Sequence, residues 1–315
     1  MEQGGPELET AIVTSAQFDH RKVDWPRVRR GRYLIHQHLR YEYPGSIRNL
    51  RQRLIILPPE QYGDQRLVTH RFEVSLSTAR PEYQSDSFGN RQLSIFVPRV
   101  EQCIDFEAWI LIEREAQNRQ HYLSSTWLTN PRLLEPSALT QPNDELRQIA
   151  RELMDVGEGG LALAERINTW VYHHIQYAHE VTDIHTTAAQ ALLLQRGVCQ
   201  DYAHLMLALC RLCALPARYV SGHMLGEGGT HAWVEVIVPV ADQPDIALAV
   251  PFDPTHDRQA TLSYLTIAVG RDYFDVAPTS GTYEATYSGQ LSGRKHVGLT
   301  HLDYEETVDT VLEEE

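Results

Sequence analysis

The chain has 315 residues, of which 42% are hydrophobic and 22% are charged. This composition is typical of a folded, water-soluble protein and excludes wholesale disorder, while the length favours two domains. The chain has 42 acidic and 28 basic side chains, and the formal net charge of −14 repels phosphate backbones and anionic lipids. We therefore expect neither nucleic acid nor a membrane as a partner, and the charge favours basic or neutral substrates.

The N-terminal segment and the cysteine usage indicate a cellular compartment. The segment MEQGGPELETAIVTSAQ has neither the basic start nor the apolar stretch of a signal peptide, and no run of about 18 apolar residues occurs. The cysteines are too few and too unevenly spread for a disulfide framework in a chain of this length. They are Cys103, Cys199, Cys210 and Cys213. We predict a cytoplasmic protein with free thiols.

The first half of the chain has the pattern of a β-domain. Residues 1–30 have mixed charge and little periodicity, which predicts a mobile or loosely packed leader. Short alternating runs follow, such as YLIHQHLRYEY, VTHRFEVSLS and FEAWILIERE, rich in β-branched and aromatic residues. We expect an antiparallel β-domain over residues 31–118. Proline and polar residues then gather over residues 119–142, which predicts a linker.

Helical periodicity dominates the region that follows. It begins at DELRQIARELM and continues through LALAERINTWVYHHIQY, in which apolar residues recur every four positions. In TAAQALLLQRG, the spacing of Thr187 and Gln190 predicts a capping box, and Gly197 is placed to end that helix. Two strand-like runs come later, HAWVEVIVP and IALAVPFDP. Helices followed by strands predict an α+β core over residues 143–281, with residues 282–315 as a C-terminal extension.

Cys199 lies where the loop RGV leads into the amphipathic helix CQDYAHLMLALC. A thiol is a weak nucleophile at neutral pH unless its thiolate is favoured, commonly by a helix N-terminus and a neighbouring imidazole. His231 begins the first later strand and Asp253 ends the second, so adjacent antiparallel strands would bring the two side chains together. Each residue alone is more often structural, but the ordered set predicts a Cys–His–Asp site.

Other motifs have plainer interpretations. Cys210 and Cys213 form a CxxC motif, but it falls inside the predicted core helix and the sequence has no second one, which argues against a metal or redox site. His204 projects from the far side of the helix that begins at Cys199, so we interpret it as a packing or hydrogen-bonding residue. His223 and His256 remain weaker alternatives to the strand histidine.

Several stretches resemble a known family. RGVCQDYAHLMLALCRLCALPARYVSG, THAWVEVIVP and PFDPTH resemble, in this order, the core of the transglutaminase-like superfamily, and in particular its bacterial branch of proposed cysteine proteases. RYLIHQHLRYEYP and DSFGNRQLSIF resemble the N-terminal β-domain of that branch, and AVGRDYFDVAPTSG resembles a stretch after its aspartate. The resemblance covers about residues 32–281. It implies an α+β fold in which an N-terminal antiparallel β-domain precedes a papain-like core of helices packed on an antiparallel sheet.

The resemblance also implies a chemistry. It implies a triad of Cys199, His231 and Asp253 in which the thiolate attacks a peptide or amide carbonyl and forms a thioester. No cofactor and no metal are implied, and calcium is not expected because the sequence has no dense acidic loop. Candidates for substrate contact are Trp233, Arg271 and Tyr273. Trp233 is as easily a core residue, and Arg271 could equally hold a loop through an ion pair.

The residues leave the final reaction open. We expect a cysteine peptidase or amidase that acts on peptide, protein or other amide substrates, with a glutamine–amine transglutaminase as the alternative, because both reactions share the thioester. An alternative of another class is a non-catalytic binding or scaffold protein that keeps the fold. The deciding geometry is an imidazole within hydrogen-bond reach of Cys199 with Asp253 on its far nitrogen. The oligomeric state cannot be inferred from the sequence.

Overall fold

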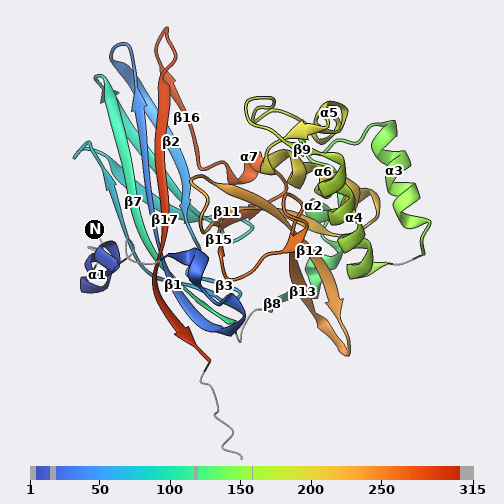
Figure 1. The fold of residues 1–315 in the computed structure, drawn as a ribbon. Coiled ribbons are helices and arrows are strands. Elements are labelled where there is room, and N and C mark those ends of the chain that lie inside the picture. The colour runs from blue at the N-terminus through green and yellow to red at the C-terminus, as the bar shows by residue number, and fades with distance from the viewer. Residues whose placement is uncertain (1–4, 15–18, 117–119, 158, 306–315) are drawn as a thin grey trace, which may run out of the picture.

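The computed structural model describes residues 5–14, 19–116, 120–157 and 159–305. Two antiparallel sheets form a β-domain at one end of the molecule, on the left in Figure 1. The larger sheet has the order β17 (Gln290–Tyr304), β1 (Val28–Glu42), β7 (Cys103–Glu115), β4 (Gln65–Val74) and β3 (Gln61–Tyr62). The smaller has the order β16 (Thr279–Glu284), β2 (Ile47–Leu57), β6 (Arg91–Val100) and β5 (Arg80–Ser85).

Alternation along the strands builds the core of the β-domain. In β7, Ile104, Phe106, Ala108 and Ile110 are buried at every second position, and the residues between them are more exposed. Burial of each large apolar side chain contributes about 1.5–3 kcal/mol. Helix α1 (Pro6–Thr14), which lies within the predicted leader, packs its buried Leu8 against a second, smaller cluster on the same sheet.

The chain returns to the β-domain near its C-terminal end. Strand β17 pairs with β1 from Tyr304 opposite Val28 to Gln290 opposite Glu42, and β16 pairs with β2. The predicted C-terminal extension, residues 282–315, therefore supplies β17 to the larger sheet and the second half of β16 to the smaller one (Figure 1). These pairings join segments more than 200 residues apart in the sequence.

The rest of the chain forms an α+β core, on the right in Figure 1. Its six-stranded antiparallel sheet has the path β14 (Arg258–Gln259), β13 (Gln243–Asp253), β12 (His231–Val240), β11 (Ala217–Met224) and β15 (Tyr264–Gly270), with β8 (His121–Ser124) paired to β13. The main helices are α3 (Asp144–Met154), α4 (Gly160–His174), α5 (Ala188–Leu194) and α6 (Cys199–Leu212). The α+β architecture predicted from the sequence is confirmed.

Helix α6 is the centre of the core. Its apolar residues Leu205, Met206 and Leu209 are completely buried, as its amphipathic pattern predicts. Helices α3, α4 and α5 pack against α6, which itself packs on β11 and β12. None of the helices in the described ranges is long and apolar enough to cross a bilayer.

The shorter elements complete the chain. They are 3₁₀ turns at His20–Lys22, Trp25–Arg27 and Ser125–Thr129, helices α2 (Pro131–Leu134) and α7 (Tyr273–Val276), and the short parallel pair β9 (Gln176–Tyr177) and β10 (Arg196–Gly197). The predicted linker therefore includes β8, a 3₁₀ turn and α2, which cover the edge of the core sheet at β13. The predicted capping box of Thr187 and Gln190 is present at the start of α5.

Two buried amide side chains join the β-domain to the core. Gln65 donates to the carbonyl of Thr266 and accepts its N–H, each at 2.8 Å. Asn90 does the same with Val269, at 2.7 and 2.8 Å. Strand β15 lies at the edge of the core sheet, where its backbone groups would otherwise lack partners. These bonds satisfy backbone groups of that edge strand and fix the orientation of the two parts around the groove between them.

Candidate active site

Cys199 is the first residue of α6 and is half-buried. The turn before it is held by Asp201, whose Oδ2 accepts the backbone N–H of Val198 at 2.8 Å and the hydroxyl of Thr182 at 2.7 Å. A Cβ at Gly197 would lie 2.5 Å from the same oxygen, so only glycine lets the carboxyl approach this closely. The thiol is thus held at a rigid helix N-terminus, whose free N–H groups favour negative charge.

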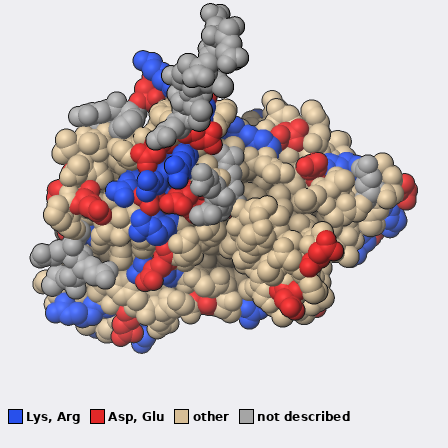
Figure 2. All heavy atoms as spheres, turned by 90° about the horizontal axis from the view of Figure 1, so that it is seen from below, with Lys and Arg blue, Asp and Glu red and all other residues tan. Residues whose placement is uncertain are grey.

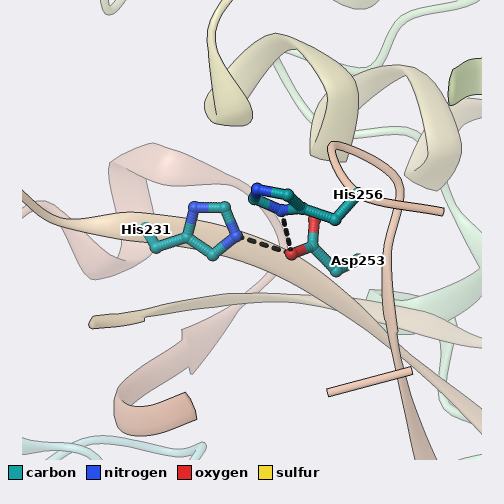
Figure 3. Close-up of side chains that lie close together, drawn as sticks. All are labelled: His231, Asp253 and His256. Atoms are coloured by element: carbon teal, nitrogen blue, oxygen red, sulfur yellow. Dashed lines mark hydrogen bonds and ion pairs between the residues drawn. The ribbon is translucent and has the colours of Figure 1, made fainter. Parts of the chain in front are cut away.

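His231 and Asp253 meet across neighbouring strands. His231 begins β12 and Asp253 ends β13, and the register Val234 opposite Phe252 brings the two side chains together. Nε2 of His231 donates to Oδ2 of Asp253 at 2.8 Å (Figure 3). The exposed fractions of the two side chains are 2% and 0%. Because an ionised carboxylate only accepts hydrogen bonds, this contact places a proton on Nε2.

Asp253 accepts three further hydrogen bonds. Its Oδ2 accepts from Nδ1 of His256 at 2.8 Å and from the hydroxyl of Tyr264 at 2.6 Å, and its Oδ1 accepts the N–H of Thr255 at 2.9 Å. Burial raises the pKa of Asp253, but these bonds and the bond from His231 outweigh it, and the pKa lies well below its usual value. The carboxylate is therefore ionised throughout the neutral range.

The His231 ring also contacts the thiol. Burial lowers the pKa of His231, but hydrogen bonds to Asp253, Cys199 and Glu227 outweigh burial and raise the pKa well above its usual value. Since Nε2 is bound to Asp253, Nδ1 is the nitrogen that faces Cys199. The ring is thus an imidazolium at neutral pH, held between a thiol and a buried carboxylate. This is the arrangement that stabilises a thiolate.

The sequence analysis missed Glu227. This residue lies in the loop between β11 and β12, with its Oε2 3.3 Å from Nδ1 of His231 and its Oε1 3.6 Å from Nε2 of His256. The hydrogen bond to His231 lowers the pKa of the Glu227 carboxyl. The signal in the sequence is the run LGEGGTH, where Gly226 adopts a φ of 95° and so allows the tight turn that directs Glu227 back to the histidines.

His256, a weaker alternative in the sequence, is a second imidazole on the same carboxylate. Ligand atoms of His231, Asp253 and His256 lie within 4.8 Å of one another, a spacing that a metal ion could use. The nitrogen atoms nearest Asp253 already donate to its Oδ2, however (Figure 3). A metal would have to displace both bonds, so the arrangement fits a hydrogen-bonded network better than a metal centre.

The remaining candidates lie in different surroundings. Trp233 is 1% exposed, stacks on the His231 ring with 6.1 Å between centroids, and is not among the cleft-lining residues. Arg271 pairs with Asp275 at 2.9 Å outside the cleft, whereas Tyr273 lines it. His204 is buried in the core and accepts the N–H of Tyr273 at 3.2 Å, as its packing interpretation predicts.

The CxxC cysteines lie inside helix α6. Cys210 and Cys213 are both buried, and burial raises the pKa of the Cys213 thiol to about 11. Burial likewise raises the pKa of the Cys210 thiol well above its usual value. These two thiols therefore stay protonated at neutral pH.

A cleft of about 840 Å³ opens beside Cys199 and His231, between the core and the β-domain. The core contributes Tyr177, Tyr219, Glu227, His256 and Tyr273 to its walls, and the β-domain contributes Leu39, Thr279, Leu291 and Lys295. A hollow of about 830 Å³ on the smaller β-sheet has no cysteine or histidine among its described lining residues. Cys199 and His231 therefore both lie in the cleft between the two parts.

Family models agree with this arrangement. Residues 147–246 match the model described as transglutaminase-like superfamily, and residues 33–113 match the bacterial transglutaminase-like N-terminal region. Together these matches cover more than half of the chain. The chain belongs to the transglutaminase-like superfamily. The N-terminal match corresponds to the β-domain, and the superfamily match contains Cys199 and His231 but ends before Asp253.

Relatives and a solved structure extend the likeness. An uncharacterized protein of Mycobacterium leprae is 33% identical over 181 residues, which are 54% of this chain and 58% of that protein. The alignment thus spans less than two thirds of that relative. An uncharacterized protein of Mycobacterium bovis is 25% identical over 79% of this chain and 87% of its own length. The crystal structure of a proposed cysteine protease from Cytophaga hutchinsonii shares the fold, with a TM-score of 0.68, 22% identity and coverage of 88% and 93%.

Proposed function

We propose that this transglutaminase-like protein is a Cys–His–Asp acyl-transfer enzyme that hydrolyses peptide or amide bonds through a thioester. The observation that carries the proposal is the position of the His231 ring. One nitrogen donates to the buried Asp253 and the ring also contacts Cys199, at the edge of a cleft large enough for a peptide segment. The substrate in this proposal is a peptide or other amide and not a nucleic acid or a lipid.

The acylation half-reaction follows from these positions. The thiolate of Cys199 attacks the amide carbonyl, so an S–C bond forms and the carbonyl oxygen becomes an oxyanion. The backbone N–H of Cys199, in the first turn of α6, is a donor suited to that oxyanion. The carbonyl then reforms, the C–N bond breaks, and the Nδ1 proton of His231 passes to the departing amine. Asp253 keeps the ring oriented through Nε2.

Deacylation regenerates the thiol site. His231, now neutral, takes a proton from water as the water oxygen attacks the thioester. The C–S bond breaks, a carboxylic acid leaves, and the thiolate and imidazolium are restored. A primary amine in place of water would give a new amide by the same steps.

The test identifies whether water or an amine forms the new bond to the acyl group. A library of peptides and peptide amides is incubated with the protein in ¹⁸O-labelled water, with and without a primary amine, and the products are read by mass spectrometry. We expect ¹⁸O in a new carboxylate and no product with Cys199→Ala. Amine incorporation that outpaces ¹⁸O uptake would favour the transglutaminase instead. No product in any condition, together with no acyl adduct on Cys199, would favour a scaffold that keeps the fold.

A further inference from the structure

The cleft wall that the β-domain contributes contains a lysine from strand β17. Lys295 lies on β17 directly opposite Gln37 of β1. Residues opposite one another in an antiparallel pair point to the same face of the sheet. Gln37 is buried on the face that meets the core, where its Nε2 lies 3.2 Å from Nε2 of His223. The side chain of Lys295 therefore points toward the core.

Lys295 belongs to the same cleft as Cys199. Leu291 and Lys295, four residues apart on one face of β17, both line the cleft that contains Cys199 and His231. Strand β17 lies outside both of the regions that match family models. The C-terminal strand thus forms a wall of the site that the family match does not cover.

Within the described residues, the ammonium group of Lys295 has no counter-ion. Burial lowers the pKa of Lys295 to about 8, and among the described residues no carboxylate lies within 4.0 Å of its Nζ. The group still carries its charge at pH 7. Glu227, the acidic residue among the described lining residues of the cleft, is already bound to His231 and His256. A partly buried cation that lines the cleft, with no acidic partner among the described residues, can bind an anionic group of a ligand.

Two arginines of the same sheet are paired with carboxylates. Arg30 contacts Asp303 at 2.8 Å and Arg32 contacts Glu113 at 2.6 Å. Figure 2 shows the same pattern on the face seen from below, where Lys and Arg are interspersed with Asp and Glu over the β-domain. Unlike these two arginines, Lys295 has no acidic side chain within 4.0 Å among the described residues.

We propose that Lys295 binds a carboxylate of the substrate, so that the cleft selects peptides or amides with a carboxylate group near the bond that is cleaved. The proposal rests on the proposed function and names its substrate class. The carboxylate belongs either to an acidic side chain or to a free C-terminus, and an ammonium group binds both. The net charge of −14 favours basic or neutral substrates at long range, but salt screens that field beyond about 10 Å, whereas Lys295 acts at contact distance.

Two alkylating reagents of the same mechanism test the proposal. Iodoacetate carries a carboxylate and iodoacetamide does not, so the ratio of their rates at Cys199 measures the attraction of a carboxylate to the cleft. At pH 7 we expect Lys295→Met to lower this ratio about tenfold, with the iodoacetamide rate nearly unchanged. Lys295→Arg should restore most of the ratio. The matched control is Arg294→Met, which removes a charge from the exposed neighbouring position of β17 and should leave the ratio unchanged.

The two proposals fail in different ways. A low iodoacetamide rate in the parent would count against the proposed enzymatic function. The ratio of the two alkylation rates can still be measured for a slow thiol, so the test of Lys295 remains valid in that case. An unchanged ratio in Lys295→Met, or an equal drop in Arg294→Met, would overturn the carboxylate site.

Competing peptides identify the source of the carboxylate. One peptide has a glutamate side chain and an amidated C-terminus, a second has a neutral side chain and a free C-terminus, and a third has no carboxylate. We expect the first, the second or both to protect Cys199 from iodoacetamide in the parent and in Lys295→Arg, but not in Lys295→Met. Equal protection by the third peptide, or no protection by either carboxylate peptide at millimolar concentration, would contradict the proposal.

Discussion

On the core side of the cleft, Asp253 is fully buried and accepts hydrogen bonds from two histidines, a tyrosine and a backbone N–H, whereas on the β-domain side Lys295 has no partner among the described residues. The hydrogen bonds of the core side hold Asp253 and its partners in one arrangement before any ligand binds, which the proposed catalysis requires. The β-domain side presents a charge with no counter-ion in the part of the chain that the structure describes, which suits recognition of a ligand. The residues proposed to carry out the reaction thus lie on the core side, and the residue proposed to select the substrate lies on the β-domain side.

The largest expected effect is loss of the network on the core side. Asp253→Ala leaves the buried His231 ring without its carboxylate, and breaking a buried ion pair costs about 3–5 kcal/mol of the free energy of unfolding. Urea denaturation measures this change. The control is Glu42→Ala, which removes the exposed partner of Arg40 and should cost less than about 1 kcal/mol. Similar losses for the two variants would contradict the contrast between buried and exposed pairs.

The next effect is the loss of stability at low pH that the buried histidines cause. Burial lowers the pKa of His223 and of His204 to about 3, below the value of 6.5 that each has when unfolded. The unfolded chain therefore binds more protons than the folded one between about pH 6.5 and pH 3. Stability falls as the pH is lowered through this window, and each histidine contributes up to about 1.4 kcal/mol per pH unit.

Unfolding free energies measured from pH 6.5 downward test this slope. The two buried histidines contribute about equally to this slope, so His223→Gln should remove about half of their joint contribution. His185→Gln, at an exposed position, should leave it unchanged. A slope that is the same in His223→Gln and in the parent would show that His223 is not held neutral against Gln37.

His231 changes the stability with pH in the opposite direction to the two buried neutral histidines. Its pKa is raised in the folded state, so its contribution to stability is complete below the unfolded value of 6.5 and is lost as the pH rises toward the folded value. We expect stability to decline above about pH 6.5 by up to about 1.4 kcal/mol per pH unit from this group. His231→Gln should flatten that decline. An unchanged decline would mean that the ring is not held as an imidazolium.

The smallest expected effect is the change in alkylation rates at Cys199 when the negative charge of the core side is removed. Glu227→Gln removes a negative charge beside His231, while Lys295→Met removes a positive one across the cleft. We expect Glu227→Gln to raise the ratio of iodoacetate to iodoacetamide alkylation at Cys199 about threefold, the reverse of the lysine variant. A fall in this ratio would mean that the carboxylate does not repel anions from the thiol.

The sequence predicts the core side far better than the β-domain side. Cys199, His231 and Asp253 lie within 55 residues of one another, and a helix start and two alternating strands determine where each side chain points. Glu227 was missed because it lies in a loop, where no periodicity marks a side chain's direction. The helix before Cys199 ends at Leu194 and is capped by Gln195, with a left-handed φ of 51°, and not by the predicted Gly197, which accommodates Asp201.

Strand β17 shows why the other wall was not predicted. Its partner β1 lies more than 200 residues away, so no turn or local pattern links the two segments. Its own sequence, QLSGRKHVGLTHLDY, alternates weakly and contains two glycines. Only the paired strands place Lys295 opposite Gln37 and so in the cleft.

The most direct test of the account is the rate of iodoacetamide labelling of Cys199 at about pH 6, where an ordinary thiol is almost fully protonated. The parent is compared with His231→Gln, and the half-buried Cys103 in the β-domain is the internal reference. Far-UV circular dichroism confirms that the variant is folded. We predict labelling of Cys199 at least about tenfold faster in the parent than in the variant, with Cys103 unchanged. Equal rates at Cys199 in the two proteins would contradict an activated Cys–His pair.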